Sequence, residues 1–442
     1  MAPALTPGRP AQPVIPFHVV SFSTLTAILV AIASAALAQN AALPPDIRDL
    51  AGDPAVKSAL ESVKRNEPRF IEEQIRICEI PAPPFHEDVR GKELERLFKQ
   101  AGLENVRIDT VGNVIGVRPG ASPHPNFVIS AHLDTVFPEG TDVHVTRQQS
   151  AKGGGAILKG PGIGDDCRGL AVLLGVIHAL NEAGVKTSGT ITFVADVGEE
   201  GLGDLRGTKN LFDDSLRGQI DKFVSIDGTG LSITNVGVGS YRYRATFKGP
   251  GGHSFGAFGM ANPIQAMGRA IAKIDAFDVP STPKTTFNVG RVGGGTSVNA
   301  VPFECWMEVD MRSADKDSLE AVNTKYKAAV TQAIEEENRR WSNRGPVSVS
   351  NELVGVRPAG STPPESPIVV TAAAVSKLFG FGGRLNESST DSNVPMNRGI
   401  PAITIGGGGM GMGAHGSNET FDTTESWLGT QRALLLAVAL AR

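Results

Sequence analysis

The stretch NFVISAHLDT (residues 126–135) decides how the rest of the chain is interpreted. Its first residues form an apolar run without a regular polar face, which is typical of a strand buried on both sides of a parallel sheet. The run ends in a histidine and an aspartate, His132 and Asp134. Since sites in open parallel sheets form beyond the carboxyl ends of strands, the stretch predicts a buried strand with functional side chains at its end.

Similar apolar runs recur at GTITFVADVGEE (189–200), DKFVSIDGTG (221–230) and PAITIG (401–406). Residues 45–79 and 89–103 have helical patterns, and 105–119 is typical of a hairpin. Further helical patterns lie at 168–183, 367–379 and 426–441. The alternation of strands and helices predicts an α/β fold, with a mostly parallel sheet and helices on both of its faces.

The pattern changes after about residue 235, where GSYRYRATFKGPGG (239–252) alternates like an antiparallel strand. Helices are expected at 263–276 and 317–339, and strands at 285–292 and 302–312. We therefore expect an α+β domain at 236–353, inserted into a catalytic domain made of 45–235 and 354–442. Within it, YRYRATF (241–247) is expected to be an exposed edge strand that could pair with a second chain.

The N-terminus carries a predicted export signal. FSTLTAILVAIASAALA (22–38) is a short apolar run that ends in Ala36-Leu37-Ala38, which is typical of a signal peptide cleaved after Ala38. Residues 1–38 are therefore expected to be removed, and the protein to be periplasmic or secreted. Because no other stretch has the ~20 apolar residues that span a bilayer, no membrane span is expected after cleavage.

Composition excludes some classes of function. The chain has 442 residues, with 42 Lys and Arg against 46 Asp and Glu and a net charge of −4. It has no basic block, so a nucleic-acid partner is not expected. Its three cysteines include no CxxC pair, so neither a disulfide framework nor a thiolate zinc site is expected.

Polar side chains gather where the predicted strands end. They are His132, Asp134, Glu199, Glu200, Asp227 and His415, together with Asp165 and Asp166 in the turn that opens a helix. Each alone has an ordinary explanation as a solvated or structural residue. Together they would repel one another at a single rim unless cations were bound. Imidazole and carboxylate groups suit Zn²⁺, and Mn²⁺ or Co²⁺ less selectively.

The spacing of these residues suggests roles. In His132-x-Asp134, strand alternation would put both side chains on one side, so that Asp134 could orient the imidazole. In Glu199-Glu200 the side chains diverge, so one could bind metal while the other faces the substrate. A Glu that binds no metal, beside an activated water, is the expected general base.

The motifs of the chain resemble those of the M20 family of zinc-dependent peptidases and amidohydrolases. The resemblance covers about residues 70–442, and its motifs appear in the family's order. They are SAHLDTV (130–136), GPGIGDDCRG (161–169), DVGEEGLGDLRG (196–207), SIDGTG (225–230), KGPGGHS (248–254), GGTSVNAVP (294–302), EVDMRS (308–313), STDSNVP (389–395), GIPAITIG (399–406) and AHGSNE (414–419).

The resemblance implies a centre of two zinc ions per subunit. One ion would be held by His132, Asp165 and Asp227, and the other by Asp165, Glu200 and His415, so that Asp165 bridges them. Glu199 would be the general base. In the family, the peptide bond between the positions of Asp165 and Asp166 is often cis. The usual lysine after this pair is replaced here by Cys167, which we interpret as a small buried residue behind the site.

The resemblance also implies a homodimer. The inserted block matches the family's dimerisation domain, in which His253 would enter the partner's active site and stabilise the oxyanion. Asn299 and Arg312 match positions that hold the carboxylate or carbonyl of the substrate. The glycines at 406–409 suit close backbone contact with a substrate end.

The leading interpretation is therefore an exported zinc-dependent hydrolase of amide bonds, an exopeptidase of short peptides. One alternative is an N-acyl-amino-acid amidohydrolase or desuccinylase of the same family. Another is a binding protein that keeps the fold without catalysis.

Overall fold

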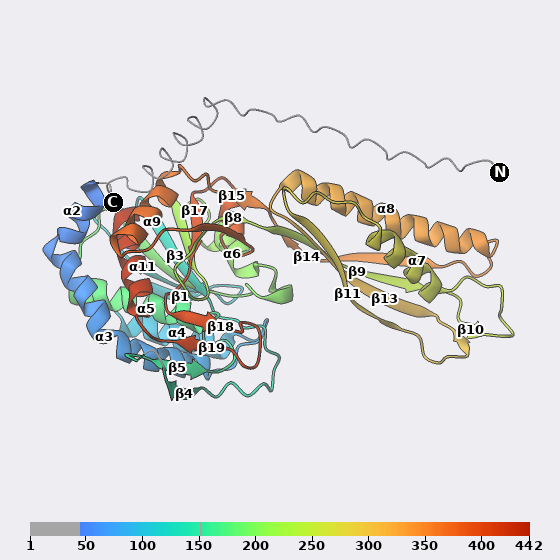
Figure 1. Cartoon of the computed structure of the whole chain (residues 1–442), viewed down its shortest axis with the longest axis horizontal. Coiled ribbons are helices and arrows are strands. Elements are labelled where there is room, and N and C mark those ends of the chain that lie inside the picture. The colour runs from blue at the N-terminus through green and yellow to red at the C-terminus, as the bar shows by residue number, and fades with distance from the viewer. Residues whose placement is uncertain (1–44, 151–152) are drawn as a thin grey trace, which may run out of the picture. The chain divides into compact units, whose positions relative to one another are not determined.

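The computed structural model describes residues 45–150 and 153–442. The predicted signal peptide, residues 1–38, lies outside the described residues. No helix within them is long and apolar enough to cross a bilayer. Pro45–Arg442 belong to one compact unit, which contains three larger sheets and one short strand pair among its described residues (Figure 1).

The central sheet of the described residues has nine strands in the order β1-β2-β6-β3-β7-β17-β8-β15, and β16 also pairs with β8. The four strands in the middle, β6, β3, β7 and β17, are parallel, and antiparallel pairs flank them. The bounds are β1 (Glu104–Ile108), β2 (Val114–Arg118), β3 (Asn126–His132), β6 (Thr190–Asp196), β7 (Lys222–Ile226), β8 (Ile233–Gly237), β15 (Gly360–Ser361), β16 (Leu385–Ser388) and β17 (Ala402–Ile405).

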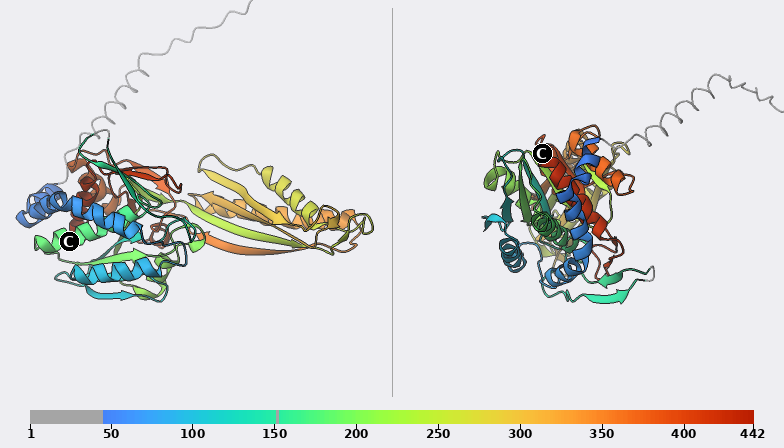
Figure 2. Two further views of the ribbon diagram at one scale, coloured as in Figure 1. Left: turned by 90° about the horizontal axis from the view of Figure 1, so that it is seen from below. Right: turned by 90° about the vertical axis from the view of Figure 1, so that its left-hand side faces the viewer.

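Helices cover both faces of this sheet (Figure 2). Leu211 and Phe212 pack with Val128 and Phe223 on one face, and α5 and α11 pack against β3 on the other. The elements are α2 (Pro45–Gly52), α3 (Pro54–Cys78), α4 (Asp88–Gln100), α5 (Cys167–Glu182), α6 (Arg206–Asn210), α9 (Pro367–Leu378), α10 (Asn393–Asn397) and α11 (Trp427–Leu440), with the short turns η1 (Gly201–Gly203) and η2 (Leu211–Ser215). The predicted fold class is confirmed.

The first predicted helix is divided in two. Helix α2 ends at Gly52, and the Asp53 carboxylate then accepts hydrogen bonds from the backbone N–H groups of Ala55 and Val56. This side chain satisfies N–H groups that have no partner inside α3, and Pro54 is tolerated in the first turn because it has no N–H to satisfy. A cap followed by proline therefore starts a new helix inside the range 45–79.

Strands β3 and β6 are buried at every position. This follows from the cover on both faces, and it explains why their sequences show continuous apolar runs rather than alternation. The two strands are parallel and in register, with His132 opposite Asp196 at their carboxyl ends. Residues that follow each strand are thus brought to the same rim.

A small antiparallel sheet that the sequence did not reveal joins two distant segments. Its order is β18-β19-β5-β4, with β4 (Thr146–Gln149), β5 (Ala156–Lys159), β18 (Met410–Met412) and β19 (Thr420–Asp422). Strands of three or four residues are too short for a periodic pattern to show. The pairing of β19 with β5 connects the glycine-rich segment after β17 to the turn before α5.

The inserted sheet has the order β11-β13-β9-β14, all antiparallel, and α7 and α8 lie along it (Figure 1). The bounds are β9 (Gly239–Lys248), α7 (Pro263–Asp275), β11 (Thr285–Gly294), β13 (Glu304–Ser313), α8 (Lys316–Arg340) and β14 (Ser348–Arg357), and the short strands β10 (Gly252–His253) and β12 (Ala300–Val301) form a separate pair.

The prediction that 241–247 forms an edge strand is wrong. Strand β9 is paired on one side with β13 and on the other with β14, so the edges are β11 and β14. The cause is strand β14, which was not predicted and which fills the expected free edge. The expected end of the inserted domain, at residue 353, falls inside β14.

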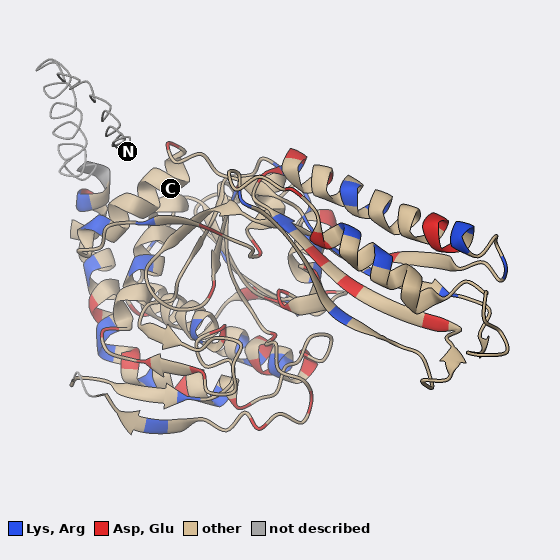
Figure 3. Ribbon diagram, turned by 45° about the vertical axis from the view of Figure 1, so that its right-hand side comes forward, with Lys and Arg blue, Asp and Glu red and all other residues tan. Residues whose placement is uncertain are grey.

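The two faces of the inserted sheet differ in chemistry. Tyr243, Ala245 and Phe247 of β9 are buried in a core that α7 and α8 complete. The residues between them point to the opposite face, where Lys, Arg, Asp and Glu recur along the strands (Figure 3). Alternation thus gives this sheet one apolar and one charged face.

Candidate metal centre

The strand ends bring five predicted metal ligands together. In one group, His132, Asp165 and Asp227 each offer a donor atom within 4.8 Å of the others, and in a second group Asp165, Glu200 and His415 do so. Both groups contain Asp165. They are the same two sets that the family resemblance implies. A third possible group joins His132 with Glu199 and Glu200.

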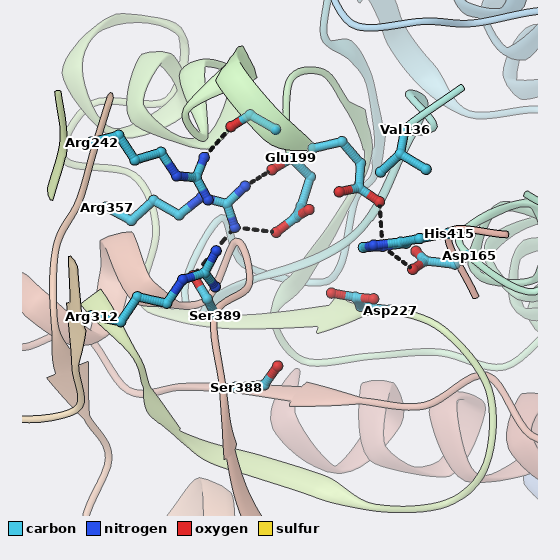
Figure 4. A pocket seen from close by; sticks show the side chains of 12 residues that line it. Val136, Asp165, Glu199, Asp227, Arg242, Arg312, Arg357, Ser388, Ser389 and His415 are labelled. Carbon is cyan, nitrogen blue, oxygen red and sulfur yellow. Dashed lines mark hydrogen bonds and ion pairs between the residues drawn. The ribbon is translucent and has the colours of Figure 1, made fainter. Parts of the chain in front are cut away.

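The Asp165 carboxylate lies between the two imidazoles. Its Oδ1 atom is 3.1 Å from Nε2 of His132. Its Oδ2 atom is 3.2 Å from Nε2 of His415, a contact that Figure 4 shows. Burial alone would raise the pKa of Asp165, but the hydrogen bonds from the two imidazoles outweigh it and the pKa lies below its usual value. The peptide bond between Asp165 and Asp166 is cis, as in the family pattern.

His132 is oriented by a backbone group. Its Nδ1 atom lies 3.0 Å from the carbonyl oxygen of Asp134, which can only accept, so Nδ1 carries the proton. The Asp134 carboxylate is 3.7 Å from Nδ1 and accepts instead from the N–H groups of Gly198, Glu199 and Glu200. This differs from the expected contact because β3 ends at His132, so strand alternation does not extend to Asp134.

Asp166 serves the scaffold beside the centre. Its carboxylate accepts from the N–H groups of Gly169 at the start of α5, of Gly228 and of His132, at 3.0 to 3.2 Å. Burial raises the pKa of Asp166 well above its usual value. The paired aspartates therefore have different tasks: Asp165 faces the donor cluster, and Asp166 ties α5 to the ends of β3 and β7.

The segment that carries His415 is held by two buried arginines. Arg168 donates through Nε to the carbonyl oxygen of Gly407 at 2.8 Å, and Arg432 donates to that of Gly406 at 2.5 Å. His415 itself is more than half exposed, and hydrogen bonds to Asp165 and Glu200 raise its pKa to about 10. The imidazole thus contacts the carboxylates, while α5 and α11 hold the start of the segment at Gly406 and Gly407.

Cys167 is fully buried and packs in an apolar cluster with Cys78 and Phe421. It offers no ligand to the metal-compatible groups of the described residues. This placement agrees with our interpretation of Cys167 as a small buried residue behind the site.

The donor set fits divalent cations. Nε2 of His132 lies 3.1 Å from Oδ1 of Asp165, a contact that is satisfied by a proton on Nε2 or by a cation held between the two atoms. Burial, together with the nearby charge of Asp165, raises the pKa of Asp227 to about 7, because both disfavour the ionised carboxylate. No lysine is among the described residues that line the pocket beside this cluster. Imidazole with carboxylate is a donor set suited to zinc-type ions.

The donor cluster opens into a pocket of about 400 Å³. Arg242, Arg312 and Arg357 form the side of the pocket that faces the cluster (Figure 4). Arg357, at the end of β14, donates to the Glu199 carboxylate at 3.0 Å and also to its backbone carbonyl oxygen. Glu199 thus lies between the metal-compatible cluster and the arginines. Its burial raises its pKa well above the usual value.

Two of the arginines share one carboxylate. Asp310 Oδ1 accepts from Nε of Arg242 at 3.1 Å, and Oδ2 accepts from Nε of Arg312 at 2.7 Å. Arg242 also donates to the carbonyl oxygen of Gly201, directly after Glu200. Burial, with the neighbouring Arg357 guanidinium, lowers the pKa of Arg242. The predicted substrate residue Arg312 therefore lines the pocket as one of a group.

His253 and Asn299 lie elsewhere in the chain's own fold. Both are exposed and neither lines the pocket. Strand β10 pairs His253 with Ala300, which places the two residues at the same end of the inserted segment. The Asn299 carbonyl oxygen accepts from the N–H of Ser254. The contribution of His253 to a partner's site stays a prediction.

Sequence reasoning missed Arg242 and Arg357. A signal for Arg242 was present, because YRYR alternates and puts Arg242 on the polar face of a strand that leads to the site. Arg357 gave no such signal, because it ends the unpredicted strand β14.

The chain belongs to the peptidase family M20/M25/M40, whose model matches residues 128–441. This agrees with the combination of a mostly parallel sheet, an inserted sheet and a His and carboxylate cluster. An uncharacterised protein of Bacillus subtilis, YqjE, is 27% identical over 77% of this chain and 90% of its own length. Carboxypeptidase G2 of a Pseudomonas strain is 24% identical over 52% of this chain and 56% of its own length.

Solved structures share the fold at low sequence identity. A tripeptidase from Staphylococcus aureus has a TM-score of 0.70 and 22% identity over 85% of this chain and 99% of its own. The YXEP protein of Bacillus subtilis, described as a dinuclear metal-binding peptidase of the M20 family, has a TM-score of 0.61 and 18% identity, with coverage of 85% and 99%. These structures support the fold assignment.

Proposed function

We propose that this protein hydrolyses amide bonds of short peptides as an exopeptidase that uses two zinc ions. The observation that carries the proposal is the pair of donor groups that share Asp165 and open into one pocket. Membership of the M20/M25/M40 peptidase family supports the reaction class. Relatives named carboxypeptidase G2 and cytosol non-specific dipeptidase support peptide substrates.

The chain's residues would hold the ions in two sets. His132, Asp165 and Asp227 form one set, and Asp165, Glu200 and His415 form the other. Co²⁺ or Mn²⁺ could substitute for zinc. When bound, the ions would supply a nucleophilic water at neutral pH and polarise the scissile carbonyl. Oδ1 of Asp165 faces His132 and Oδ2 faces His415, so this carboxylate would serve both sets.

Glu199 would move the proton. Its carboxylate is beside the donor cluster and within the pocket, where it can accept a proton from water and pass it to the leaving amine. Asp134 holds the backbone N–H groups of both Glu199 and Glu200, so one carboxylate fixes the general base and a metal ligand relative to each other. Arg357 orients the Glu199 carboxylate from the opposite side.

A second candidate is hydrolysis of N-acyl amino acids. The arginines that line the pocket suit a free carboxylate, which peptides and N-acyl amino acids both carry. A relative named N-acetylcysteine deacetylase, 26% identical over 34% of this chain, supports this alternative. A binding protein without catalysis is the remaining alternative.

Metal analysis and a substrate panel test the proposal. Protein purified without chelators is expected to contain close to two zinc ions per chain. It should release free amino acids from di- and tripeptides and leave N-acetyl amino acids intact. Activity on N-acyl amino acids with none on peptides would favour the amidohydrolase. Metal-free protein that stays inactive after zinc is added would leave only the binding protein.

We also propose export and dimer formation. The apolar run at 22–38 and its Ala36-Leu37-Ala38 ending support cleavage after Ala38. N-terminal sequencing of protein from the native host should therefore find Gln39 first, and an intact 1–38 would refute export. The exposed position of His253 supports a role in a partner's site, which requires a homodimer.

A further inference from the structure

Two segments that carry candidate metal ligands meet at Glu419. Asp165 lies in the turn between β5 and α5, and His415 lies between β18 and β19. Strands β5 and β19 are antiparallel neighbours, with Lys159 opposite Thr420. Glu419 directly precedes β19, so this pairing places it against the start of the turn that leads to Asp165.

The Glu419 carboxylate binds backbone groups of that turn. Its Oε2 atom accepts from the N–H of Gly162 at 2.9 Å, and its Oε1 atom accepts from the N–H groups of Gly164 and Asp165 at 2.8 and 3.0 Å. The backbone carbonyl oxygen of Glu419 accepts from the N–H of Gly160 at 3.1 Å. The N–H groups of one turn therefore converge on a single residue.

The glycines of the turn allow this close approach. Gly162 has a φ of +77°, a conformation that other residues rarely adopt. A Cβ atom at Gly164 would lie 3.1 Å from Oε1 of Glu419 and 2.9 Å from Cγ2 of Thr229. Neighbouring backbone N–H groups that converge in this way form a concavity that binds anions. Here the anion is a side chain of the same chain rather than a ligand.

The proposed chemistry does not use this buried carboxylate. Glu419 belongs to none of the metal-compatible groups of the described residues, and it is not among the described residues that line the pocket. It is buried, and its charge lies near that of Asp165. Burial beside a like charge is unfavourable for a carboxylate. The hydrogen bonds from the turn offset this cost, and their effect is to fix the backbone at Asp165.

Glu419 holds Asp165 directly and His415 through the chain. Asp165 donates its backbone N–H to Glu419, and His415 precedes Glu419 by four residues. Between them the backbone is tightly turned, since the N–H of Glu419 donates to Gly416 at 3.0 Å and the N–H of Gly416 donates to Gly413 at 2.9 Å. The spacing of the two ligands thus has a hydrogen-bonded support within the protein.

We propose that Glu419 is a positioning residue that keeps Asp165 and His415 at the spacing of a metal site. This inference rests on the proposed metal centre, and it assigns Glu419 no contact with metal or substrate. The donor set that contains His415 should depend strongly on Glu419. The other set should depend on it less, because His132 stands at the end of the buried strand β3.

Zinc titration of Glu419→Gln tests the proposal. The amide keeps one acceptor oxygen, but its NH₂ group can only donate, so it cannot replace the second carboxylate oxygen opposite the N–H groups of the turn. We expect the more weakly bound zinc ion to lose about 10–100-fold in affinity, the usual effect of removing a group that supports a metal ligand. Calorimetry measures this without turnover. Unchanged affinity for both ions would overturn the proposal.

Glu337→Gln is the matched control. Glu337 is also a buried glutamate, but it lies in the inserted segment, where it accepts from the backbone N–H of Asn262 and from Trp341 and pairs with Arg269. Its replacement should lower the thermal midpoint of the metal-free protein without changing zinc affinity. An equal loss of zinc affinity in this variant would refute a specific role for Glu419.

Hydrogen exchange of the wild type tests the same contacts even if Glu419→Gln does not fold. In metal-free protein the amides of Gly162, Gly164 and Asp165 should exchange much more slowly than in the unfolded chain, because Glu419 already binds them. Fast exchange there would refute the positioning role. Wild type that binds no zinc would overturn the proposed metal centre and this inference with it. Wild type that binds two ions no more tightly than Glu419→Gln would overturn this inference alone.

Discussion

The central sheet and the inserted sheet place their functional side chains in different ways. In the central sheet the middle strands β3, β6 and β17 are buried at every position, and candidate metal ligands stand at strand ends, as His132 does at the end of β3 and Asp227 directly after β7. In the inserted sheet the strands are antiparallel and one face is open. There the polar groups lie along the strand, as Arg242 and Asp310 do.

The difference shows how two kinds of sheet can build one pocket. Parallel strands with helices on both faces bring their carboxyl ends to one rim, so residues distant in sequence meet as a donor cluster. In the antiparallel inserted sheet, alternation instead gives a row of charged side chains along one face. The last side chains of this row reach the pocket. The carboxylates of the donor cluster come from strand ends and from the turn before α5, and Arg242 and Arg312 come from a strand face.

The strongest test of the strand-end cluster is Asp165→Ala. This variant should lose both metal ions and all measurable activity, because Asp165 is the residue common to both donor groups. His415→Ala should mainly weaken one ion. Metal content per chain, measured after dialysis against trace zinc, compares the two variants. Loss of a single ion in both would contradict a bridging role.

Glu199→Ala should separate catalysis from metal binding at the same rim. We expect activity to fall on the order of 10²–10⁴-fold, the usual contribution of a general base, with zinc content unchanged. Steady-state kinetics and metal analysis on the same preparation check both parts. If the variant lost one equivalent of zinc while Glu200→Ala kept it, the roles of the two glutamates would be reversed.

His253→Ala tests whether the inserted segment acts on a second chain. We expect turnover to fall on the order of 10²–10³-fold, as for loss of an oxyanion donor, with unchanged zinc content. Mixing His253→Ala with Glu199→Ala chains should restore one working site per heterodimer, about a quarter to a half of wild-type activity by symmetry. No recovery, with subunit exchange confirmed by mass, would exclude action in trans.

The smallest expected effect on activity comes from the apolar face of the inserted sheet. Phe247→Ala removes a fully buried ring and should lower the free energy of unfolding by about 3–5 kcal/mol, without changing zinc content. Arg244→Gln on the charged face should cost less than about 1 kcal/mol, since its ion pair with Glu308 is partly exposed. Urea unfolding measures both. Equal losses would contradict the assignment of the two faces.

The parts that sequence predicted well are those with a strong repeating pattern. The buried runs at 126–135 and 189–200 predicted β3 and β6, and the polar residues after them predicted where the donor cluster would form. The family motifs then grouped the ligands into two sets, and the structure brings together the same residues. Their roles as ligands, and that of Glu199, await the measurements above.

The parts that sequence did not predict depend on pairing between distant segments. Strand β14 was missed, so β9 was expected at an edge although it lies inside the sheet. The contact of Asp134 was expected at an imidazole, but the end of β3 directs its carboxylate to three backbone N–H groups. The Arg242–Asp310 pair also requires the register of two strands, which no local pattern reveals.

Arg168 and Arg432, which donate hydrogen bonds to the glycine run at 406–409, bear on how activity would be lost on heating. Glycines lose more conformational entropy on ordering than other residues, so the segment before His415 is ordered at high entropic cost. Arg168 and Arg432 offset this cost from α5 and α11, through hydrogen bonds to Gly407 and Gly406. Segments of this kind open at lower free energy than the global fold. Thermal inactivation should therefore begin with departure of His415 from the centre while the sheet is still folded, and it should reverse on cooling.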